Sequence, residues 1–455
     1  MIFYFLSCQA PQANRLSSGP NVTREYSQQL LQSPPEAEDI NPDPNILEIE
    51  LRAAPKVHEI VDWQSEEAIV VEGYAYNDLL PAPTIRGKIG DTVIVHLTNA
   101  LDAPTTIHWH GFDVPNEMDG TPLVQPPVQP GETFTYTFTL DRAGTAWYHP
   151  HFDTEHQVNH GLYGTFIIDD PSQPVPENEL IVILDDWNFA AEHDDGSAHR
   201  AHDTYYEGTW TANGLVAPLL DLSGSDALSL RVINASNFGY AKLGFPDGSF
   251  QIGNDAGLLS KAIELEQLTL TPGDRGHMLL PISTSPQEIT KLPFSHHGGD
   301  SLEDSVTVWT QQASQNASVD LTGYSFDQAQ PSVDPNYTDA VFSFQGDPRS
   351  MRWVINGEEF PNVTPHRFAY GTAAIWELRN ISATHHPFHL HGMAFEVLSR
   401  NGIPPDNRQI EDTIDLALYE RVRIKVPMDN LGEWMTHCHI LPHGDSGMMT
   451  IIHVE

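Results

Sequence analysis

The chain has 455 residues and is strongly acidic, with 62 Asp and Glu against 22 Lys and Arg and a formal net charge of −40. This charge argues against binding to nucleic acid or to an anionic membrane through a basic face. The length suits two to four domains, and 40% hydrophobic residues are enough to fill their cores.

The N-terminal segment differs in composition from the rest. Residues 1–8 form an apolar run, too short to span a membrane, that is typical of the end of an export signal. Its last three residues, Leu6-Ser7-Cys8, weakly resemble the cleavage site of a bacterial lipoprotein, which would place a lipid anchor at Cys8; simple secretion and a chance cysteine are the alternatives. The Ser, Pro, Asn and Gln that follow are typical of a flexible tether. We expect residues 1–47 to be this remnant and tether, and the protein to be extracytoplasmic: periplasmic, on the cell surface or secreted.

Alternating apolar and polar residues then predict half-buried strands at 92–98, 134–140 and 421–426. One strand recurs three times and ends at Asn99, Asn234 and Asn380, which lie 135 and 146 positions apart. This repeat indicates three copies of one β-domain. The predicted fold is therefore all-β, with three consecutive Greek-key β-sandwich or barrel domains. We place them at residues 48–172, 173–335 and 336–455.

Histidine gathers in four short clusters that supply ten imidazoles. The clusters are His108-Trp109-His110, His149-Pro150-His151, His386-Pro387-Phe388-His389-Leu390-His391, and His437-Cys438-His439 followed by His443. Repeated His-x-His and His-x-x-His groups indicate metal ligands rather than isolated structural histidines.

The last cluster indicates which metal is bound. Cys438, His443 and Met448, together with the distant His386, offer one thiolate, two imidazoles and a thioether, which is typical of an electron-transfer copper site. Zinc is the rival metal, because Cys and His also bind it. A single cysteine among ten histidines favours copper.

The same cluster predicts a link between two metal sites. Side chains alternate along a strand, so Cys438 points one way while His437 and His439 both point the other. The repeat locates the second site: nine residues after Asn99 comes His108, and nine after Asn380 comes His389. The equivalent stretch of the middle copy, residues 243–245, has no ligand. Eight imidazoles of the first and third copies can thus meet across a pseudo-twofold interface.

With all four motifs present in order, residues 48–455 resemble a three-domain multicopper oxidase of the bacterial laccase type. The resemblance implies cupredoxin-like domains and four copper ions: one type 1, one type 2 and two type 3. The implied ligands are His386, Cys438 and His443 with axial Met448 for type 1; His108 and His389 for type 2; His110, His149 and His439 for one type 3 ion; and His151, His391 and His437 for the other. In that family, electrons taken singly at type 1 pass through the cysteine to the other three coppers, where dioxygen becomes two waters.

The resemblance also implies catalytic residues. These are Cys438, His437 and His439 for electron transfer and Asp119 for proton supply, although an Asp before Gly120 is also a common turn residue. Many bacterial relatives have Glu directly after the last type 1 histidine. Here that position is Gly444, so this proton route is missing or shifts to Asp445 or a water chain.

The axial methionine implies a low type 1 potential, and hence easily oxidised donors such as methoxyphenols, catechols and aromatic amines. We expect a monomer. Cuprous ion is the alternative donor, in copper tolerance, but only nine Met and no Met-rich insertion are present. A copper-free cell-envelope scaffold is a further alternative, yet such a scaffold would have lost its copper ligands. Five histidines outside the motifs are expected on the surface or in loops: His193, His199, His202, His296 and His297.

Overall fold

The computed structural model describes residues 27–63, 67–187, 209–222, 224–292, 294, 305–347 and 352–455. Cys8 and the five histidines His193, His199, His202, His296 and His297 lie outside these described residues. Within them the chain forms the strands β1–β28, two short α-helices and one 3-10 turn. No helix in these ranges is long and apolar enough to cross a membrane. The all-β prediction is confirmed.

The recurring strand has the same neighbours in each copy. It pairs in parallel with a strand before it and antiparallel with a strand after it. The three sets are β1 (Ile46–Asp62), β4 (Thr92–Asn99) and β6 (Thr133–Thr139); β9 (Asn178–Trp187), β12 (Leu228–Asn234) and β15 (Arg275–Leu280); and β18 (Ala340–Asp347), β21 (Thr372–Asn380) and β26 (Arg421–Met428). The repeat read from the three asparagines is therefore also a repeat of topology.

The first copy consists of two four-stranded sheets, in the orders β2-β1-β4-β6 and β3-β8-β7-β5. The further strands are β2 (Glu67–Tyr76), β3 (Ala82–Lys88), β5 (His108–His110), β7 (Gly144–His149) and β8 (Gly164–Asp169). The 3-10 turn η1 (Asn116–Met118) and the helix α1 (Thr154–Asn159) lie in its loops. The second sheet carries the two histidine clusters of this copy on the neighbouring strands β5 and β7.

The third copy also has two sheets, in the orders β19-β18-β21-β26-β23-β24 and β20-β28-β27-β22-β25. The further strands are β19 (Arg352–Ile355), β20 (His366–Phe368), β22 (His386–Leu390), β23 (Phe395–Arg400), β24 (Ile410–Glu411), β25 (Thr413–Leu416), β27 (Gly432–Cys438) and β28 (Met449–Val454). Helix α2 (Leu441–Asp445) follows β27. Here the neighbouring strands β22 and β27 carry the histidine clusters, as β5 and β7 do in the first copy.

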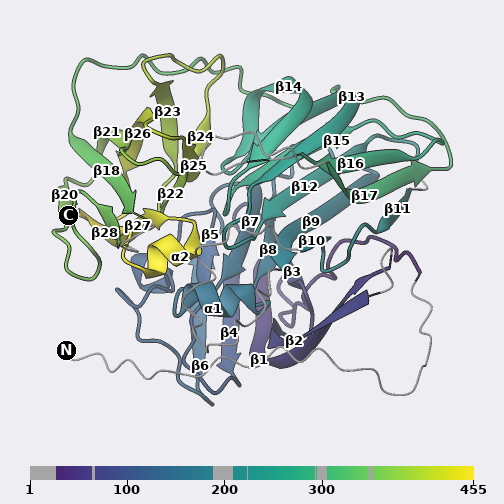
Figure 1. The fold of residues 1–455 in the computed structure, drawn as a ribbon, viewed down its shortest axis with the longest axis horizontal. Helices are drawn as coiled ribbons and strands as arrows, with labels where there is room; N and C mark the ends of the chain where they lie inside the picture. The colour runs from purple at the N-terminus through teal and green to yellow at the C-terminus, as the bar shows by residue number, and fades with distance from the viewer. Residues whose placement is uncertain are drawn as a thin grey trace.

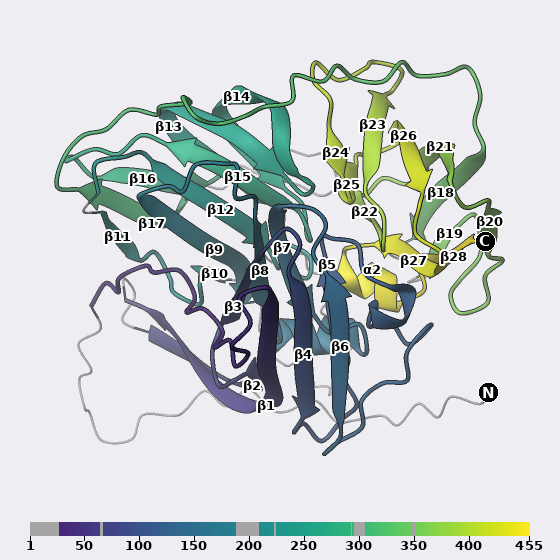
Figure 2. The same ribbon diagram turned by 180° about the vertical axis from the view of Figure 1, so that it is seen from behind.

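The middle copy forms one nine-stranded sheet, in the order β10-β9-β12-β15-β13-β16-β17-β11 with β14 paired to β13. Its remaining strands are β10 (Thr209–Ala212), β11 (Leu219–Leu222), β13 (Ala241–Asn254), β14 (Gly257–Leu270), β16 (Gln287–Lys291) and β17 (Val306–Ala313). Figure 1 shows this copy in teal, the first in purple to blue and the third in green to yellow. Helix α2 of the third copy contacts α1 of the first, close to it in Figure 1; Figure 2 shows the same arrangement of the copies from behind. The domain boundaries near residues 172 and 335 fall between strands and stay a prediction.

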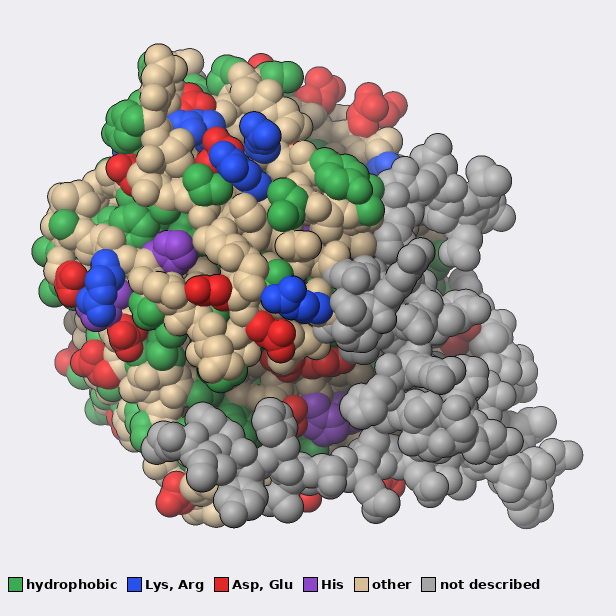
Figure 3. Space-filling model, turned by 60° about the vertical axis from the view of Figure 1, so that its left-hand side comes forward, with side chains coloured by type: hydrophobic (Ala, Val, Ile, Leu, Met, Phe, Trp, Pro, Cys, Tyr) green, Lys and Arg blue, Asp and Glu red, His purple; other side chains and the backbone are tan. Residues whose placement is uncertain are grey.

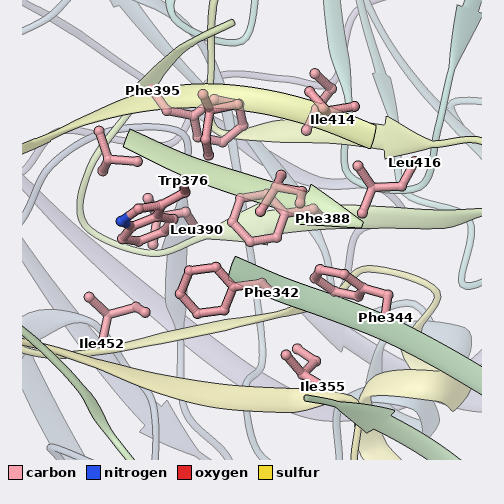
Figure 4. Packing of buried hydrophobic residues seen from close by; sticks show 14 of the residues in the cluster. Phe342, Phe344, Ile355, Trp376, Phe388, Leu390, Phe395, Ile414, Leu416 and Ile452 are labelled. Atoms are coloured by element: carbon pink, nitrogen blue, oxygen red, sulfur yellow. The ribbon is translucent and has the colours of Figure 1, made fainter. Parts of the chain in front are cut away.

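Each copy has its own apolar core. In β4 buried and half-buried residues alternate strictly, as the period-two sequence pattern predicts. Figure 4 shows the core of the third copy, where Phe388 of β22 lies among Phe342 and Trp376 of the facing sheet and Leu416 of the neighbouring strand β25. Cys438 belongs to this same buried cluster. The predicted electron-transfer site is therefore set into an apolar core.

Residues 27–44 are held against the body, in contrast to the flexible tether expected there. Leu31 is buried and its N–H donates to Leu219 O (2.8 Å). Further along, Ala37 N–H donates to Thr84 O, and Thr84 N–H donates to Pro35 O (both 2.8 Å). Composition did not predict this because the order comes from edge strands of the first two copies, which offer unpaired backbone groups to the passing chain.

Acidic side chains are spread over the surface. On the face drawn in Figure 3, red acidic side chains stand apart from one another among hydrophobic and basic ones. The surplus of 40 negative charges therefore acts as general solvation of the surface.

The three repeated asparagines close the repeated strand in the same way. Asn234 is fully buried; its Oδ1 accepts the N–H of Ser236 (3.1 Å), and its Nδ2 donates to Gly239 O (2.8 Å) and Leu270 O (2.9 Å). Asn99 and Asn380 make the matching bonds in their copies. Only a short amide offers one acceptor and two donors here.

We expect Asn234→Ala to lower the free energy of unfolding of the metal-free protein by about 3 kcal/mol, because buried backbone groups lose their partners. Chemical denaturation monitored by tryptophan fluorescence measures this. Asn45→Ala, which alters an exposed side chain, is the control and should change stability by less than about 0.5 kcal/mol. Equal effects of the two substitutions would contradict the role of the buried asparagine.

Candidate metal centre

One group of side chains joins His386 of β22, Cys438 of β27 and His443 of α2. The Nδ1 atoms of both histidines lie 3.7 Å from Cys438 Sγ, and all three side chains are buried. The antiparallel pairing of β22 with β27 brings His386 toward Cys438. Helix α2 is a single turn, and it returns His443 to the same thiol. Cys438 is a free cysteine, as the sequence predicts.

Neighbouring residues fix these two rings. Ser382 Oγ lies 2.7 Å and Thr384 Oγ1 3.2 Å from His386 Nε2, which leaves Nδ1 facing the sulfur. The indole of Trp353 stacks on His443 with ring centres 3.5 Å apart. Met448 is fully buried, and its carbonyl accepts the N–H of Cys438 (3.0 Å). Met448 therefore lies beside the cysteine, and its role as axial ligand stays a prediction.

The other eight histidines of the motifs lie together between the first and third copies. All are buried, and their ligand atoms form three groups, of which the first two share His110. The groups are His108, His110 and His389; His110, His149 and His439; and His151, His391 and His437. Each group thus takes rings from both copies, as the pseudo-twofold arrangement requires.

Ring stacking shows the pseudo-twofold relation directly. His110 stacks on His389 with centres 3.7 Å apart and an angle of 10°, and His108 stacks on His391 at 3.8 Å and 24°. The first histidine of one His-x-His therefore pairs with the second histidine of the other. Each stacked pair therefore contains one ring from the first copy and one from the third.

The nitrogen atoms of these rings have the arrangement that metal ligands need. His437 Nε2 lies 3.1 Å from His391 Nε2 and 3.3 Å from His151 Nε2. Among the described residues, His149 Nε2 and both ring nitrogens of His439 have no hydrogen-bond partner although they are buried. Buried lone pairs that face one another without donors are unfavourable unless a cation binds them. The side chains therefore fit a cluster of metal ions.

The second nitrogen of several rings is held by an acceptor. His108 Nδ1 lies 3.0 Å from Asp119 O, and His389 Nδ1 lies 3.0 Å from Asp412 O. His437 Nδ1 lies 3.0 Å from Cys438 O. Such contacts fix the tautomer and orientation of metal-binding imidazoles.

Burial sets the charge of the rings. It lowers the pKa of His151 and His386 to about 3, and it holds the pKa of His149 and His439 well below the ordinary value, helped by neighbouring imidazoles. These four rings are therefore neutral at pH 7, which is the form that binds metals. Burial raises the pKa of the Cys438 thiol, so the thiolate needs a bound cation.

Asp119 lies beneath the rings. Its carboxylate oxygens lie 3.0 and 3.1 Å from His391 Nδ1, and one lies 3.3 Å from His108 Nδ1. Burial alone would raise the pKa of Asp119, but the two imidazoles outweigh it and keep that pKa well below its usual value. Asp119 is also a turn residue, as the following glycine suggested. Gly120 has φ 81°, and a Cβ there would lie 1.8 Å from Ile107 O. The glycine thus allows the loop to place the carboxylate under the rings.

At Gly444 the chain lacks the side chain that many relatives carry. A Cβ at this position would lie 3.1 Å from Cys438 O and 3.9 Å from His437 Nδ1, so a longer side chain could reach the ring cluster from here. Asp445 instead accepts the N–H of Glu155 (2.9 Å) at the junction of α2 with α1. Among the described residues, Asp445 makes no hydrogen bond or ion pair with a histidine of the copper motifs.

Sequence reasoning missed Asp412, which lies between β24 and β25. Its Oδ1 lies 3.2 Å from His110 Nε2, which leaves His110 Nδ1 for a metal. No motif marks this residue, because a single Asp far from the histidines in sequence carries no spacing signal.

A small hollow of about 10 Å³ lies beside His108 and His389 and is lined by Asp113, Arg142 and Met393 among others. It has room for about one water molecule. Two larger hollows, of about 750 and 830 Å³, are lined by no histidine of the motifs. The larger hollows of the surface therefore do not mark the site of the clustered histidines.

An all-β fold with one Cys/His group and a second group of eight imidazoles defines a protein that binds several copper ions. Residues 60–173 and 329–455 each match a family model described as multicopper oxidase. The chain is 32% identical over 397 residues to multicopper oxidase mco of Staphylococcus haemolyticus, covering 83% of each chain. The chain therefore belongs to the multicopper oxidase family, and its cofactor is copper.

Two solved structures are also similar. A laccase from Pediococcus acidilactici matches with a TM-score of 0.80 and 28% identity, over 94% of each chain. A multicopper oxidase from Campylobacter jejuni, described as a metallo-oxidase, matches with a TM-score of 0.79 and 25% identity, over 98% of this chain and 99% of that one. The fold is thus that of the copper oxidases of both kinds.

We expect Cys438→Ser to abolish the intense absorption that a copper–thiolate bond gives, because the hydroxyl forms no such bond. The fold should remain, since one sulfur is replaced by a smaller atom. Visible absorption and circular dichroism of the copper-loaded variant measure both. A variant that is still blue would refute the site.

Proposed function

We propose that the protein is a laccase-like multicopper oxidase that oxidises phenols and aromatic amines one electron at a time and reduces dioxygen to water. We assign one type 1 copper to His386, Cys438 and His443, with Met448 as axial ligand. The remaining imidazoles hold one type 2 and two type 3 ions: His108 and His389; His110, His149 and His439; His151, His391 and His437. Copper at these positions supplies one-electron redox chemistry at the first site and four-electron reduction at the second.

The observation that carries the proposal is the stretch His437-Cys438-His439. Cys438 faces His386 and His443, whereas His437 and His439 face the ring cluster on the other side. Phe388 pairs with Cys438 and His389 with His437 across β22 and β27, so the two groups are built on one pair of strands. This short covalent connection suits electron transfer from a donor site to an oxygen site.

The chain's residues also suit the proton chemistry. Asp119 touches the rings of both copies and is our candidate for passing protons to the oxygen site. With Gly444 in place of an acid, we propose that protons arrive through Asp119 and water.

Aromatic donors are our choice over cuprous ion. Met448 beside Cys438 supports a low potential, and the chain has only nine Met and no Met-rich insertion. Cuprous ion remains the second candidate because the Campylobacter jejuni metallo-oxidase is similar over 98% of this chain. We also propose an extracytoplasmic monomer of three domains, at residues 48–172, 173–335 and 336–455, with a lipid anchor at Cys8.

The donor is decided by comparing oxygen uptake of the copper-loaded protein with a methoxyphenol and with cuprous ion. We expect the phenol to give the faster turnover without added copper ion. Turnover chiefly with cuprous ion would make the protein a metallo-oxidase. No uptake at full copper occupancy would support the scaffold alternative instead.

His110→Ala should reduce dioxygen uptake by more than about 100-fold, since loss of a ligand costs more than loss of an outer partner. The blue site should still be bleached by the phenol at the wild-type rate. Stopped-flow absorption and oxygen-electrode measurements separate the two effects. His96→Ala removes a histidine of the same copy that is bonded to Glu48 and Thr135, and should leave uptake unchanged. Wild-type dioxygen uptake by His110→Ala would show that this ring is not a ligand of the oxygen-reducing cluster.

A further inference from the structure

Arg275 opens β15 in the middle copy, which carries no candidate copper ligand. Its side chain is 0% exposed and lies where the three copies meet. A buried guanidinium must have its charge balanced and its five N–H groups bonded.

All five donors of Arg275 are used. Nε donates to Thr145 O of the first copy (3.1 Å), while Nη1 and Nη2 donate to Gly273 O (3.0 Å) and Asp255 O (3.3 Å) of its own copy. The two remaining N–H groups donate to Asp412 of the third copy: one on Nη1 to Oδ1 (2.7 Å) and one on Nη2 to Oδ2 (2.5 Å). This planar two-point contact fixes the carboxylate in orientation as well as in position.

Asp412 transmits this orientation to the rings. The same Oδ1 that accepts from Arg275 lies 3.2 Å from His110 Nε2, and the carbonyl of Asp412 lies 3.0 Å from His389 Nδ1. The two rings are stacked 3.7 Å apart and belong to different copies. Asp412 thus contacts both rings, as does Thr413, whose Oγ1 lies 3.0 Å from His110 Nε2 and 3.1 Å from His389 Nδ1.

The middle copy also fixes the backbone at this point. Asp255 Oδ1 accepts the N–H of Arg275 (2.9 Å), and Asp255 Oδ2 accepts the N–H of Thr413 (3.0 Å). The turn between β24 and β25 is therefore held through both its backbone and the Asp412 side chain.

We propose that Arg275 is a positioning residue for the oxygen-reducing copper cluster, acting through Asp412. By fixing the carboxylate as an acceptor, it keeps the His110 proton on Nε2 and directs Nδ1 to the metal. This inference rests on the proposed function, and it gives the copy without ligands a task in building the site.

The chain offers a matched control in Arg231 of β12, in the same copy. Arg231 donates to Glu179 Oε1 (2.9 Å) and to Oγ1 of Thr145 (2.9 Å), the same residue whose carbonyl binds Arg275. Among the described residues, Arg231 makes no hydrogen bond or ion pair with a histidine of the copper motifs. Its loss therefore weakens the same interface without reaching the rings.

The test compares Arg275→Gln, Arg275→Lys, Asp412→Asn and Arg231→Gln in the copper-loaded full chain. Copper per chain, electron paramagnetic resonance of the type 1 and type 2 ions, and single-turnover reoxidation by dioxygen are measured. For Arg275→Gln and Asp412→Asn we expect an altered type 2 hyperfine splitting and reoxidation slowed about 10-fold or more, with type 1 signals unchanged. Arg275→Lys should recover part of the rate, and Arg231→Gln should match the wild type.

Wild-type type 2 spectra and reoxidation in Arg275→Gln, even at a lowered melting temperature, would make Arg275 an ordinary interface residue. If that variant does not fold, the nearly isosteric Asp412→Asn decides between the same outcomes. A wild-type protein that shows no type 2 signal at full copper would overturn the proposed function, and the positioning role with it. A normal wild-type signal that no substitution alters overturns the positioning role alone.

Discussion

The structure depends on eight buried imidazoles that meet between the first and third copies. Their ring nitrogens approach one another to distances as short as 3.1 Å, between His391 Nε2 and His437 Nε2. In water each nitrogen would be solvated, so bringing them together is unfavourable until cations bind. Folding, docking of the two copies and metal binding are therefore coupled in this protein.

A shell of acceptors makes the arrangement specific. Asp119 from the first copy and Asp412 from the third each offer a backbone carbonyl, at the same distance of 3.0 Å, to one of the two histidines that we assign to type 2 copper. Their carboxylates contact a further ring each. The middle copy contributes Arg275, so all three copies take part although only two supply ligands.

The electron-transfer group has a different environment. Cys438 lies in the apolar core of the third copy with Phe388 and Trp434, and Trp353 covers His443. This core keeps water away from the thiolate and holds the ligands in one geometry. A laccase and a metallo-oxidase match the chain with TM-scores of 0.80 and 0.79, so overall similarity does not select the donor. Donor choice must lie in the surroundings of His386 and His443.

Much of this was present in the sequence. Alternation of apolar residues predicted the strands, because side chains of a strand take opposite faces whatever lies beyond them. The spacing from Asn99 and Asn380 to His108 and His389 predicted which copies carry ligands, and short motifs such as His437-Cys438-His439 predicted two linked sites. Such local signals can be detected in the sequence because they depend only on residues that are neighbours along the chain.

Contacts between residues far apart in the chain were decided only by the tertiary structure. Asp412 reaches His110 across 302 positions, and Arg275 reaches Asp412 across 137. A single Asp or Arg has no spacing to mark it, so its partner is known only once three separate sheets pack together. The sequence therefore determined the ligand types and their local pairing. Packing of the copies decided the tautomers of His110 and His391, because each of these rings has its acceptor in another copy.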